Sequence, residues 1–300
     1  MIFFPTFYNL VGKQYDYVFV DEAQDLNKTQ LEIVASALKS NGKLVAIGDS
    51  FQAIYSFRGG DSDSMQNIKD RFKCKSMPLS ITYRCPTSHV EFVKQFVPNI
   101  EAAPNAKKGE IINIKDDEFV NYVKENDLVL CRYNAPLFSP CLKLIAMGKK
   151  ARIVGSDFDK TLIKLIDNLK PKSVIELNEK LNRWYSREIA NLEKIGANTQ
   201  QVNDKYECIR TLINMSNANK VDDIKSYIRE IFKKDKPEIS FSTIHKAKGL
   251  EAENIFIYYP NLMPSVYAKK DWEHQQEENL MYVAYTRSLN RIYNVYPITY

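Results

Sequence analysis

The chain has 300 residues, enough for about two ordinary domains, and its 44% hydrophobic content excludes an intrinsically disordered protein. No apolar run approaches the ~18–20 residues of a membrane-spanning helix, and the opening residues lack a signal-peptide pattern, so we expect no membrane insertion and a cytoplasmic protein. The 42 basic and 37 acidic residues give a net charge of +5, which is compatible with a polyanionic partner but does not require one.

The first half of the chain alternates short β-rich runs with amphipathic stretches, which is typical of parallel α/β folds. Residues 15–20 are predicted as a buried strand. A helix is predicted from Asn27, which caps it together with Gln30, as far as Asn41 and Gly42. The remaining predictions are a helix over residues 62–72 and strands over residues 43–47, 79–82, 128–131, 151–154, 239–243, 255–259 and 292–295.

The strands fall into two clusters, and between them residues 173–236 are polar and helix-periodic. We interpret this segment as a helical insertion into the second α/β domain. Three apolar stripes are predicted to face a core: Leu177, Leu181, Trp184 and Ile189; Ile209, Leu212 and Ile213; Ile224, Tyr227, Ile228 and Ile231. Residues 102–109, rich in Ala, Pro and Lys, are predicted to connect the two lobes.

Two adjacent carboxylates, Asp21 and Glu22, come directly after the strand 15–20. Open α/β sheets bind ligands at the carboxyl ends of their strands, so the pair is expected at a ligand site. One carboxylate there can hold Mg²⁺ on a nucleotide phosphate while the other accepts a proton from an attacking water. A surface turn is the alternative for such a pair taken alone, but the preceding apolar run favours the site.

A second run, after the strand 43–47, contains the candidate phosphate-sensing side chain Gln52. Tyr55, Phe57 and Arg58 follow it and offer stacking faces and a fixed cation for single-stranded nucleic acid. Inward packing of the aromatic rings is the alternative for any one of them. Together with the acidic pair, this run resembles the third motif of the UvrD/Rep-like superfamily 1 DNA helicases.

Four further blocks follow in the order of that family. Residues 79–84 resemble its fourth motif, 128–134 the strand that begins its second motor domain, 242–251 its fifth motif and 277–287 its sixth motif. The resemblance implies that Tyr83 stacks on adenine and that Arg84 reaches the γ-phosphate. It also implies DNA contacts and further nucleotide contacts. The implied DNA contacts are Arg132, Asn134, Thr243 and His245, and the implied nucleotide contacts are Gly249, Glu251 and Arg287, the last as an arginine finger on a helix.

The resemblance further implies a fold and a function. The fold is α/β and RecA-like (P-loop NTPase-like), with parallel sheets in two lobes, an incomplete first motor domain over residues 1–83, a second over 84–172 and 237–300, and the insertion over 173–236. The function is the C-terminal motor portion of an ATP- and Mg²⁺-dependent 3′-to-5′ DNA helicase or translocase, with single-stranded DNA and the nucleotide bound between the lobes.

No phosphate-binding loop of the form G-x-x-x-x-G-K-[ST] occurs in the sequence. We therefore expect the first motor domain to be truncated and the chain alone to be inactive as an ATPase. A split or interrupted gene, a partner chain carrying the missing half, and a degenerate helicase remain open explanations. The alternative function is a non-hydrolysing module, derived from a helicase, that binds single-stranded DNA or a partner.

Overall fold

The computed structural model describes residues 3–8, 10, 12–55, 63–154, 158–216, 218–233 and 238–298. The chain forms two compact units, which we describe separately. Unit 1 contains Met1–Tyr83, Glu91–Ala103 and Ala268–Val283, and unit 2 contains Arg84–Val90, Pro104–Tyr267 and Ala284–Tyr300. These units are defined by contacts within the fold and not by function. The limits of the functional domains expected from the sequence therefore stay predictions.

Unit 1 is built on two parallel strands, β1 and β2, with two further short strands that also pair in parallel. Its elements are α1 (Phe3–Phe7), β1 (Tyr15–Val20), η1 (Ala23–Asp25), α2 (Lys28–Ala37), β2 (Leu38–Ala46), η2 (Ser50–Gln52), α3 (Ser64–Phe72), β3 (Ile81–Thr82) and β4 (Glu101–Ala102). Two helices, α4 (Thr87–Val93) and α11 (Asp271–Tyr285), contribute residues to both units.

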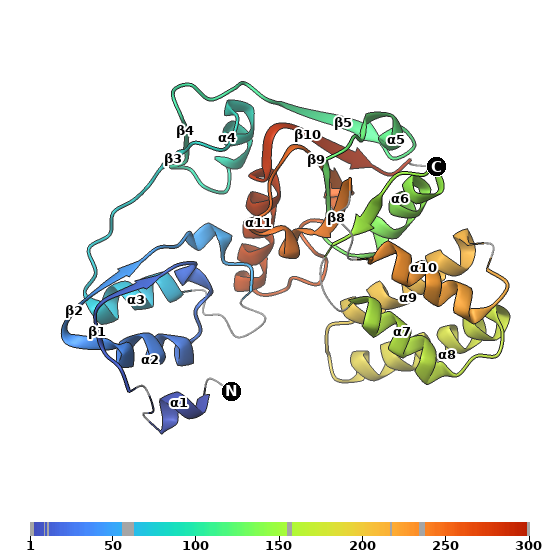
Figure 1. The fold of residues 1–300 in the computed structure, drawn as a ribbon, viewed down its shortest axis with the longest axis horizontal. Coiled ribbons are helices and arrows are strands. Elements are labelled where there is room, and N and C mark those ends of the chain that lie inside the picture. Colours follow the sequence, from blue (N-terminus) through green and yellow to red (C-terminus); the bar gives the residue numbers. More distant parts are fainter. Residues whose placement is uncertain are drawn as a thin grey trace. The chain divides into compact units, whose positions relative to one another are not determined.

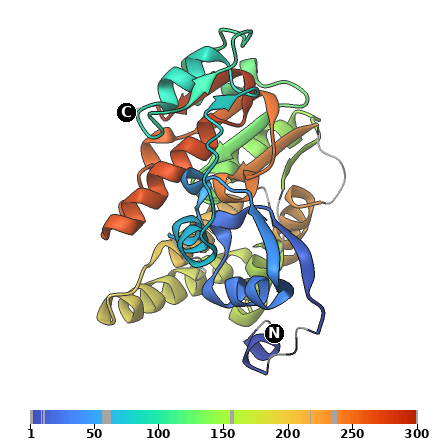
Figure 2. The same ribbon diagram turned by 90° about the vertical axis from the view of Figure 1, so that its left-hand side faces the viewer.

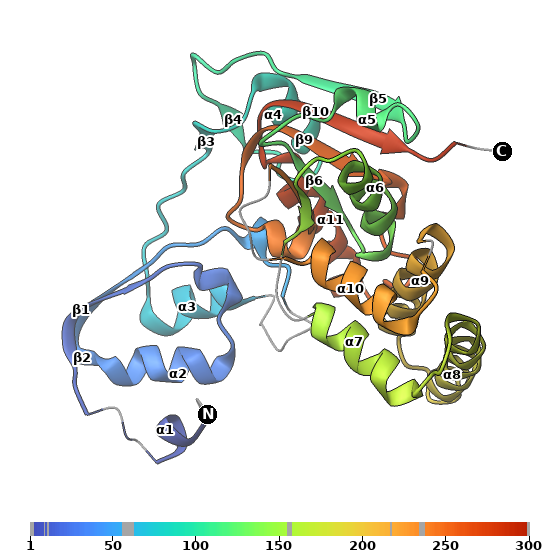
Figure 3. The same ribbon diagram turned by 45° about the vertical axis from the view of Figure 1, so that its right-hand side comes forward.

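One face of the β1–β2 pair is covered by helices. Figures 1 and 3 show α2 and α3 on the same side of these strands, and Figure 2 shows α2 beside them from another direction. Buried Leu31 of α2 and Ile68 of α3 form a small core with Ala23. The alternate strand residues Phe19 and Val45, which pair across the strands, are 70% and 40% exposed. The prediction of residues 15–20 as a buried strand is wrong, because every residue of β1 is exposed or half-buried. Parallel sheets are usually covered on both faces, so this second face is unusually apolar for exposed surface.

The N-terminal cap predicted for α2 is confirmed. Gln30 N donates to Asn27 Oδ1 at 2.9 Å, and Asn27 N donates to Gln30 Oε1 at 2.8 Å. The predicted end of the helix is wrong, because α2 ends at Ala37 and Gly42 lies within β2. The pairing register shifts beside Tyr15, and a Cβ at Gly42 would lie 2.9 Å from the Tyr15 carbonyl oxygen. Gly42 therefore permits a close strand-to-strand approach at this irregularity instead of ending a helix.

Unit 2 contains a six-stranded sheet in the order β5-β10-β9-β6-β8-β7, in which every neighbouring pair is parallel. The strands are β5 (Glu110–Lys115), β6 (Leu128–Cys131), β7 (Ala151–Ile153), β8 (Ile239–Thr243), β9 (Ala252–Tyr258) and β10 (Ser288–Tyr296). The predictions for β6 and β8 are confirmed to the residue, and those for the other strands except β5 overlap the observed ones. β5 was not predicted, although the alternation of Ile112 and Ile114 with polar residues signals an edge strand.

The insertion is helical, as predicted, and shares one hydrophobic core with the sheet. The helices of unit 2 are α5 (Phe119–Tyr122), α6 (Ala135–Ala146), α7 (Phe158–Leu169), α8 (Val174–Lys194), α9 (Gln200–Met215) and α10 (Val221–Ile231), with short turns η4 (Ile244–Ala247) and η5 (Pro260–Leu262) (Figure 3). Leu181, Leu212 and Ile228 are fully buried in the same cluster as Phe241 of β8. Tyr227 is 40% exposed, so its prediction as a core residue is wrong.

No helix in the described ranges combines the length and the apolar character needed to cross a bilayer. Trp184 packs at the edge of the core of unit 2, whereas Trp272 at the start of α11 is 39% exposed.

Because the insertion and the sheet share a core, Ile228→Ala should destabilise the whole of unit 2. We expect a loss of about 2–5 kcal/mol in the free energy of unfolding, the range for truncating a buried Ile. The measurement is urea denaturation followed by circular dichroism. Tyr227→Ala, the neighbouring exposed residue on the same helix, is the control and should change the free energy much less; equal losses in the two variants would contradict the shared core.

Candidate functional site

The acidic pair of unit 1 lies at the carboxyl end of β1, as the sequence predicts. Asp21 and Glu22 are exposed, and Glu22 N donates to Asp21 Oδ1 at 2.9 Å. Glu22 adopts a left-handed backbone conformation with φ of 51°. Such a conformation costs energy for a residue with a Cβ and is enriched at functional sites. Gln24, which is 3% exposed, donates its side-chain amide to the Glu22 carboxylate.

A second side chain, Asp49, organises the loop after β2. Its Oδ1 accepts from Phe51 N at 3.0 Å, and its Oδ2 accepts from the side-chain amide of Gln52 at 2.9 Å. Asp49 N in turn donates to Gln24 Oε1 at 3.0 Å. Gln24 therefore joins the ends of β1 and β2 by contacting Glu22 on one side and Asp49 on the other. Reasoning from sequence identified Glu22 and Gln52 but missed the two residues that orient them.

Helix α11 also contacts this loop. Asn279 Nδ2 donates to the carbonyl oxygens of Ala53 at 2.9 Å and Ser50 at 3.3 Å, and Tyr282 OH donates to Asp49 Oδ2 at 3.2 Å. The loop is thus held by side chains from a distant part of the chain.

The remaining candidates of unit 1 are Tyr55, which is half-buried, and Tyr83, which is 84% exposed. Phe57 and Arg58 lie outside the described residues. An exposed ring such as that of Tyr83 is available for stacking.

In unit 2 the residues assigned to the nucleotide converge at the amino ends of β9 and β10. Arg84 Nε pairs with Glu251 Oε2 at 2.7 Å, and Ala252 N donates to the carbonyl oxygen of Arg287 at 3.2 Å. Gly249 has a φ of +85°, a left-handed conformation that favours glycine. Arg84 and Glu251, which are 167 residues apart along the chain, thus meet at one edge of the sheet.

Arg287 is not on a helix, contrary to the sequence prediction. α11 ends at Tyr285, and Arg287 lies in the turn that leads into β10. The residue is 2% exposed, and its Nη2 donates to Thr286 Oγ1 at 3.1 Å. The Thr286 carbonyl oxygen accepts from Cys85 Sγ at 3.7 Å, which ties this turn to the residue after Arg84.

The residues assigned to DNA gather at the opposite edge of the same sheet. Thr243 is the last residue of β8 and pairs with Cys131, the last residue of β6. Arg132 follows Cys131, and His245 lies in the turn η4 that follows β8. Because neighbouring strands are parallel, their carboxyl ends lie side by side, and three of the four predicted DNA residues meet there.

Asn134, the fourth, is directed elsewhere. Its Nδ2 donates to Asp204 Oδ2 on α9 at 2.8 Å, and the Ala135 N–H donates to Asp204 Oδ1 at 2.7 Å. Burial raises the pKa of Asp204, while these two hydrogen bonds and the nearby Lys246 favour its charged form. The Oδ1 atom of Asn134 is buried without a hydrogen-bond partner among the described residues. The side-chain amide therefore contacts α9, and the DNA contact assigned to Asn134 stays a prediction.

The donor set of unit 1 suits Mg²⁺ shared with a phosphate. Mg²⁺ is usually bound by one or two carboxylates together with phosphate and water oxygens. Asp21 and Glu22 provide two exposed carboxylates, and no cluster of three or more His, Cys, Asp or Glu side chains suited to a metal occurs within the described ranges.

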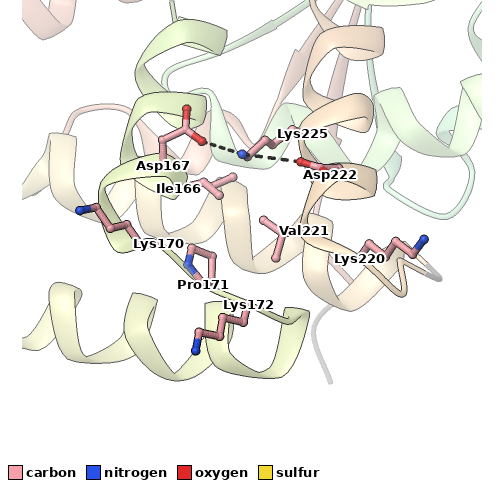
Figure 4. Close-up of a pocket in the computed structure, with 9 residues that line it drawn as sticks. All are labelled: Ile166, Asp167, Lys170, Pro171, Lys172, Lys220, Val221, Asp222 and Lys225. Carbon is pink, nitrogen blue, oxygen red and sulfur yellow. Dashed lines mark ion pairs between the residues drawn. The ribbon is translucent and has the colours of Figure 1, made fainter.

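A pocket of about 320 Å³ opens between the end of α7 and the start of α10 (Figure 4). At its upper side Lys225 pairs with Asp167 at 2.6 Å and contacts Asp222 at 3.7 Å. Figure 4 shows the ammonium ends of three other lining lysines pointing in different directions: Lys170, Lys172 and Lys220. Their charges do not converge, and we assign no ligand to this pocket.

Comparison with known proteins decides the family. The model of the UvrD-like helicase C-terminal domain matches residues 55–297, and that of the UvrD/REP helicase N-terminal domain matches residues 5–73. The chain belongs to the UvrD-like helicase family. This membership confirms the resemblance to the family, and the six-stranded parallel sheet of unit 2 confirms the α/β fold class.

Relatives in the family are longer than this chain. It is 24% identical to a probable DNA helicase II homolog of Mycoplasma pneumoniae, over 92% of this chain and 53% of the relative. It is also 24% identical to DNA helicase IV of Escherichia coli, over 93% of this chain and 34% of the relative. The chain therefore spans about half or less of the length of these relatives.

Two solved structures are also similar. The C-terminal domain of a possible DNA helicase from Lactobacillus plantarum has 10% identity and a TM-score of 0.34, covering 72% of this chain and 87% of that one. An arterivirus helicase has 12% identity and a TM-score of 0.41, covering 95% of this chain and 40% of that one.

The buried His89 of α4 makes the stability of this UvrD-like chain depend on pH. Burial lowers the pKa of His89 below its usual value of 6.5, although its Nε2 contacts the Glu110 carbonyl oxygen at 3.3 Å. The neutral form is therefore favoured in the folded protein. Stability should be complete above pH 6.5 and should fall as the pH drops below it, by up to about 1.4 kcal/mol per pH unit.

This dependence is measured by urea denaturation between pH 7.5 and 5.5. In His89→Gln the contribution should disappear, whereas His274→Gln, which replaces an exposed histidine of α11, should keep the slope of the wild type. An unchanged slope in His89→Gln would contradict the assignment.

Proposed function

We propose that the chain is the C-terminal motor portion of an ATP-dependent DNA helicase or translocase, with 3′-to-5′ polarity implied by its family resemblance. The observation that carries the proposal is the sorting of the motif residues of unit 2. The nucleotide-assigned residues occupy the amino edge of one parallel sheet, and the DNA-assigned residues occupy its carboxyl edge.

The nucleotide role divides among side chains with different chemistry. Asp21 and Glu22 would hold Mg²⁺, which would neutralise phosphate charge. Glu22 would also accept the proton of the attacking water, with Gln52 orienting that water or sensing the phosphate. Tyr83 would stack on the adenine ring.

Arg84 and Arg287 would donate to phosphate oxygens. Arg84 pairs with Glu251, and the two side chains are 39% and 47% exposed. An exposed ion pair of this kind contributes at most about 1 kcal/mol. Arg84 can therefore exchange the Glu251 carboxylate for a phosphate at small cost, while Gly249 and Glu251 stay at the edge of the nucleotide site.

The proposed DNA-binding role rests on cationic and aromatic side chains that can contact a single strand. Arg132, Thr243 and His245 would contact the backbone from unit 2. Tyr55, Phe57 and Arg58 would supply stacking and charge from unit 1, since aromatic rings accept any unpaired base.

We further propose that another polypeptide segment, carrying a phosphate-binding loop, completes unit 1. The exposed apolar face of β1 and β2, with Phe19 at 70% exposure, supports this part of the proposal. The alternative, a non-hydrolysing module, differs in that no such segment would restore hydrolysis.

Without that segment, the 300-residue chain should show no appreciable ATPase activity, even with single-stranded DNA. The phosphate loop normally supplies the main cradle for the β- and γ-phosphates, which the remaining side chains cannot replace. The measurement is phosphate release by wild type and Glu22→Gln, which should be equally inactive. Robust DNA-stimulated hydrolysis that Glu22→Gln abolishes would overturn the expectation.

Single-stranded DNA should bind at low salt and dissociate as salt rises, because phosphate contacts release counterions. Phe57→Ala should weaken binding by roughly 1–3 kcal/mol if a base stacks on that ring. The measurement is fluorescence anisotropy with a labelled oligonucleotide across a salt series. Tyr227→Ala, which removes an exposed ring from α10, is the control.

Affinity for single strands should exceed that for duplex. If folded Phe57→Ala binds as tightly as wild type, the ring has no stacking role.

A further inference from the structure

Two adjacent residues of α9, Asn203 and Asp204, are connected by hydrogen bonds to the turn that follows β6. Asp204 contacts this turn directly, through Asn134 Nδ2 at 2.8 Å and Ala135 N at 2.7 Å. α6 begins at Ala135, and Asn134 makes no side-chain cap of its own. Asp204 thus provides, from another helix, the carboxylate that a helix N-terminus favours.

Asn203 reaches the same turn through a chain of hydrogen bonds. Its Nδ2 donates to Tyr267 OH at 2.6 Å, Tyr267 N donates to Ser265 Oγ at 3.3 Å, and Ser265 Oγ and Tyr133 OH lie 2.8 Å apart. Asn203 Oδ1 accepts from Tyr185 OH of α8 at 3.0 Å. The amide of Asn203 is therefore fixed on both sides, and the position of Tyr133 depends on it.

Arg132 precedes Tyr133 in the chain and contacts its ring. Its guanidinium carbon lies 5.0 Å from the centre of the Tyr133 ring, a cation–π distance. Movement of Tyr133 would carry the guanidinium with it. Arg132 also lies beside Thr243 at the carboxyl edge of the sheet, so its orientation decides whether a cation faces that edge.

We propose that Asn203 and Asp204 are positioning residues through which the helical insertion holds Arg132 in place to bind a phosphate of single-stranded DNA. This inference rests on the DNA role proposed for the carboxyl edge. It assigns the insertion a part in DNA affinity without requiring that the insertion touch DNA.

The direction in which one substitution changes DNA affinity distinguishes a positioning role of Asp204 from a purely electrostatic one. Asp204 is a negative charge close to the DNA-assigned residues, so its removal should strengthen binding of a polyanion if only charge matters. Asp204→Asn keeps the shape of the side chain but weakens its hold on the turn, since charge-assisted hydrogen bonds are roughly twice as strong as neutral ones. Positioning therefore predicts weaker binding.

The experiment is a fluorescence-anisotropy titration of the full chain with a labelled oligo(dT) at low salt. Asp204→Asn should bind about five- to tenfold more weakly than wild type, a loss of the size of one ordinary hydrogen bond, because the substitution weakens the contact without removing it. Glu207→Gln is the matched control, because it removes the same charge from an exposed position of the same helix, where Glu207 lies 3.6 Å from Arg210. It should bind as tightly as wild type or slightly more tightly.

Two further readouts exclude a general loss of structure. Loss of one phosphate contact should lower the salt dependence of binding by about 0.7 in the logarithmic slope for a single strand, in Asp204→Asn as in Arg132→Ala. In an Arg132→Ala background, Asp204→Asn should have no additional effect. Independent losses that multiply would overturn the inference.

Tyr133→Phe guards against a folding defect in Asp204→Asn, because it removes only the hydroxyl that contacts Ser265. It should also bind DNA more weakly while unfolding at the temperature of the wild type. If Arg132→Ala binds as tightly as wild type, the DNA role of this edge fails. If Arg132→Ala binds weakly but both Asp204→Asn and Tyr133→Phe bind as wild type, the positioning role alone fails.

Discussion

The parallel direction of every strand pair in the sheet of unit 2 is the constraint on which its functional layout depends. Parallel strands place all their amino ends at one edge and all their carboxyl ends at the other. Glu251 and Arg287 precede strands and so lie at the amino edge, whereas Arg132 and Thr243 end or follow strands and lie at the carboxyl edge. The residues assigned to the nucleotide and those assigned to DNA thus lie at opposite edges of a sheet that has one hydrophobic core.

Both units contain orienting side chains that no local sequence pattern distinguishes. In unit 1, Gln24 and Asp49 orient Glu22 and Gln52, and in unit 2 Asp204 orients the turn after β6. These residues act through hydrogen bonds to neighbours instead of contacting a ligand. Removing one of these residues would loosen the orientation of the group that it contacts, and catalytic and binding groups depend on orientation.

The parts of the fold that sequence predicted well depend on local chemistry. The Asn27–Gln30 cap needs only residues three apart, and the buried strands β6 and β8 are short apolar runs bounded by polar residues. The end of α2 was mispredicted because Asn41 and Gly42 usually mark a turn, whereas here the approach of Tyr15 requires a glycine inside a strand. Motif blocks placed the candidate residues, but the Asp204 contact joins segments 70 residues apart and leaves no local signal.

We expect single-stranded DNA to bind at the carboxyl edge of the sheet of unit 2 and not at the amino edge. This is tested by hydrogen exchange measured by mass spectrometry, with and without oligo(dT). DNA binding should slow exchange in peptides covering residues 131–135 and 243–247 and leave those covering 249–252 and 286–288 unchanged. Protection of the amino-edge peptides alone, with residues 131–135 and 243–247 unaffected, would contradict it.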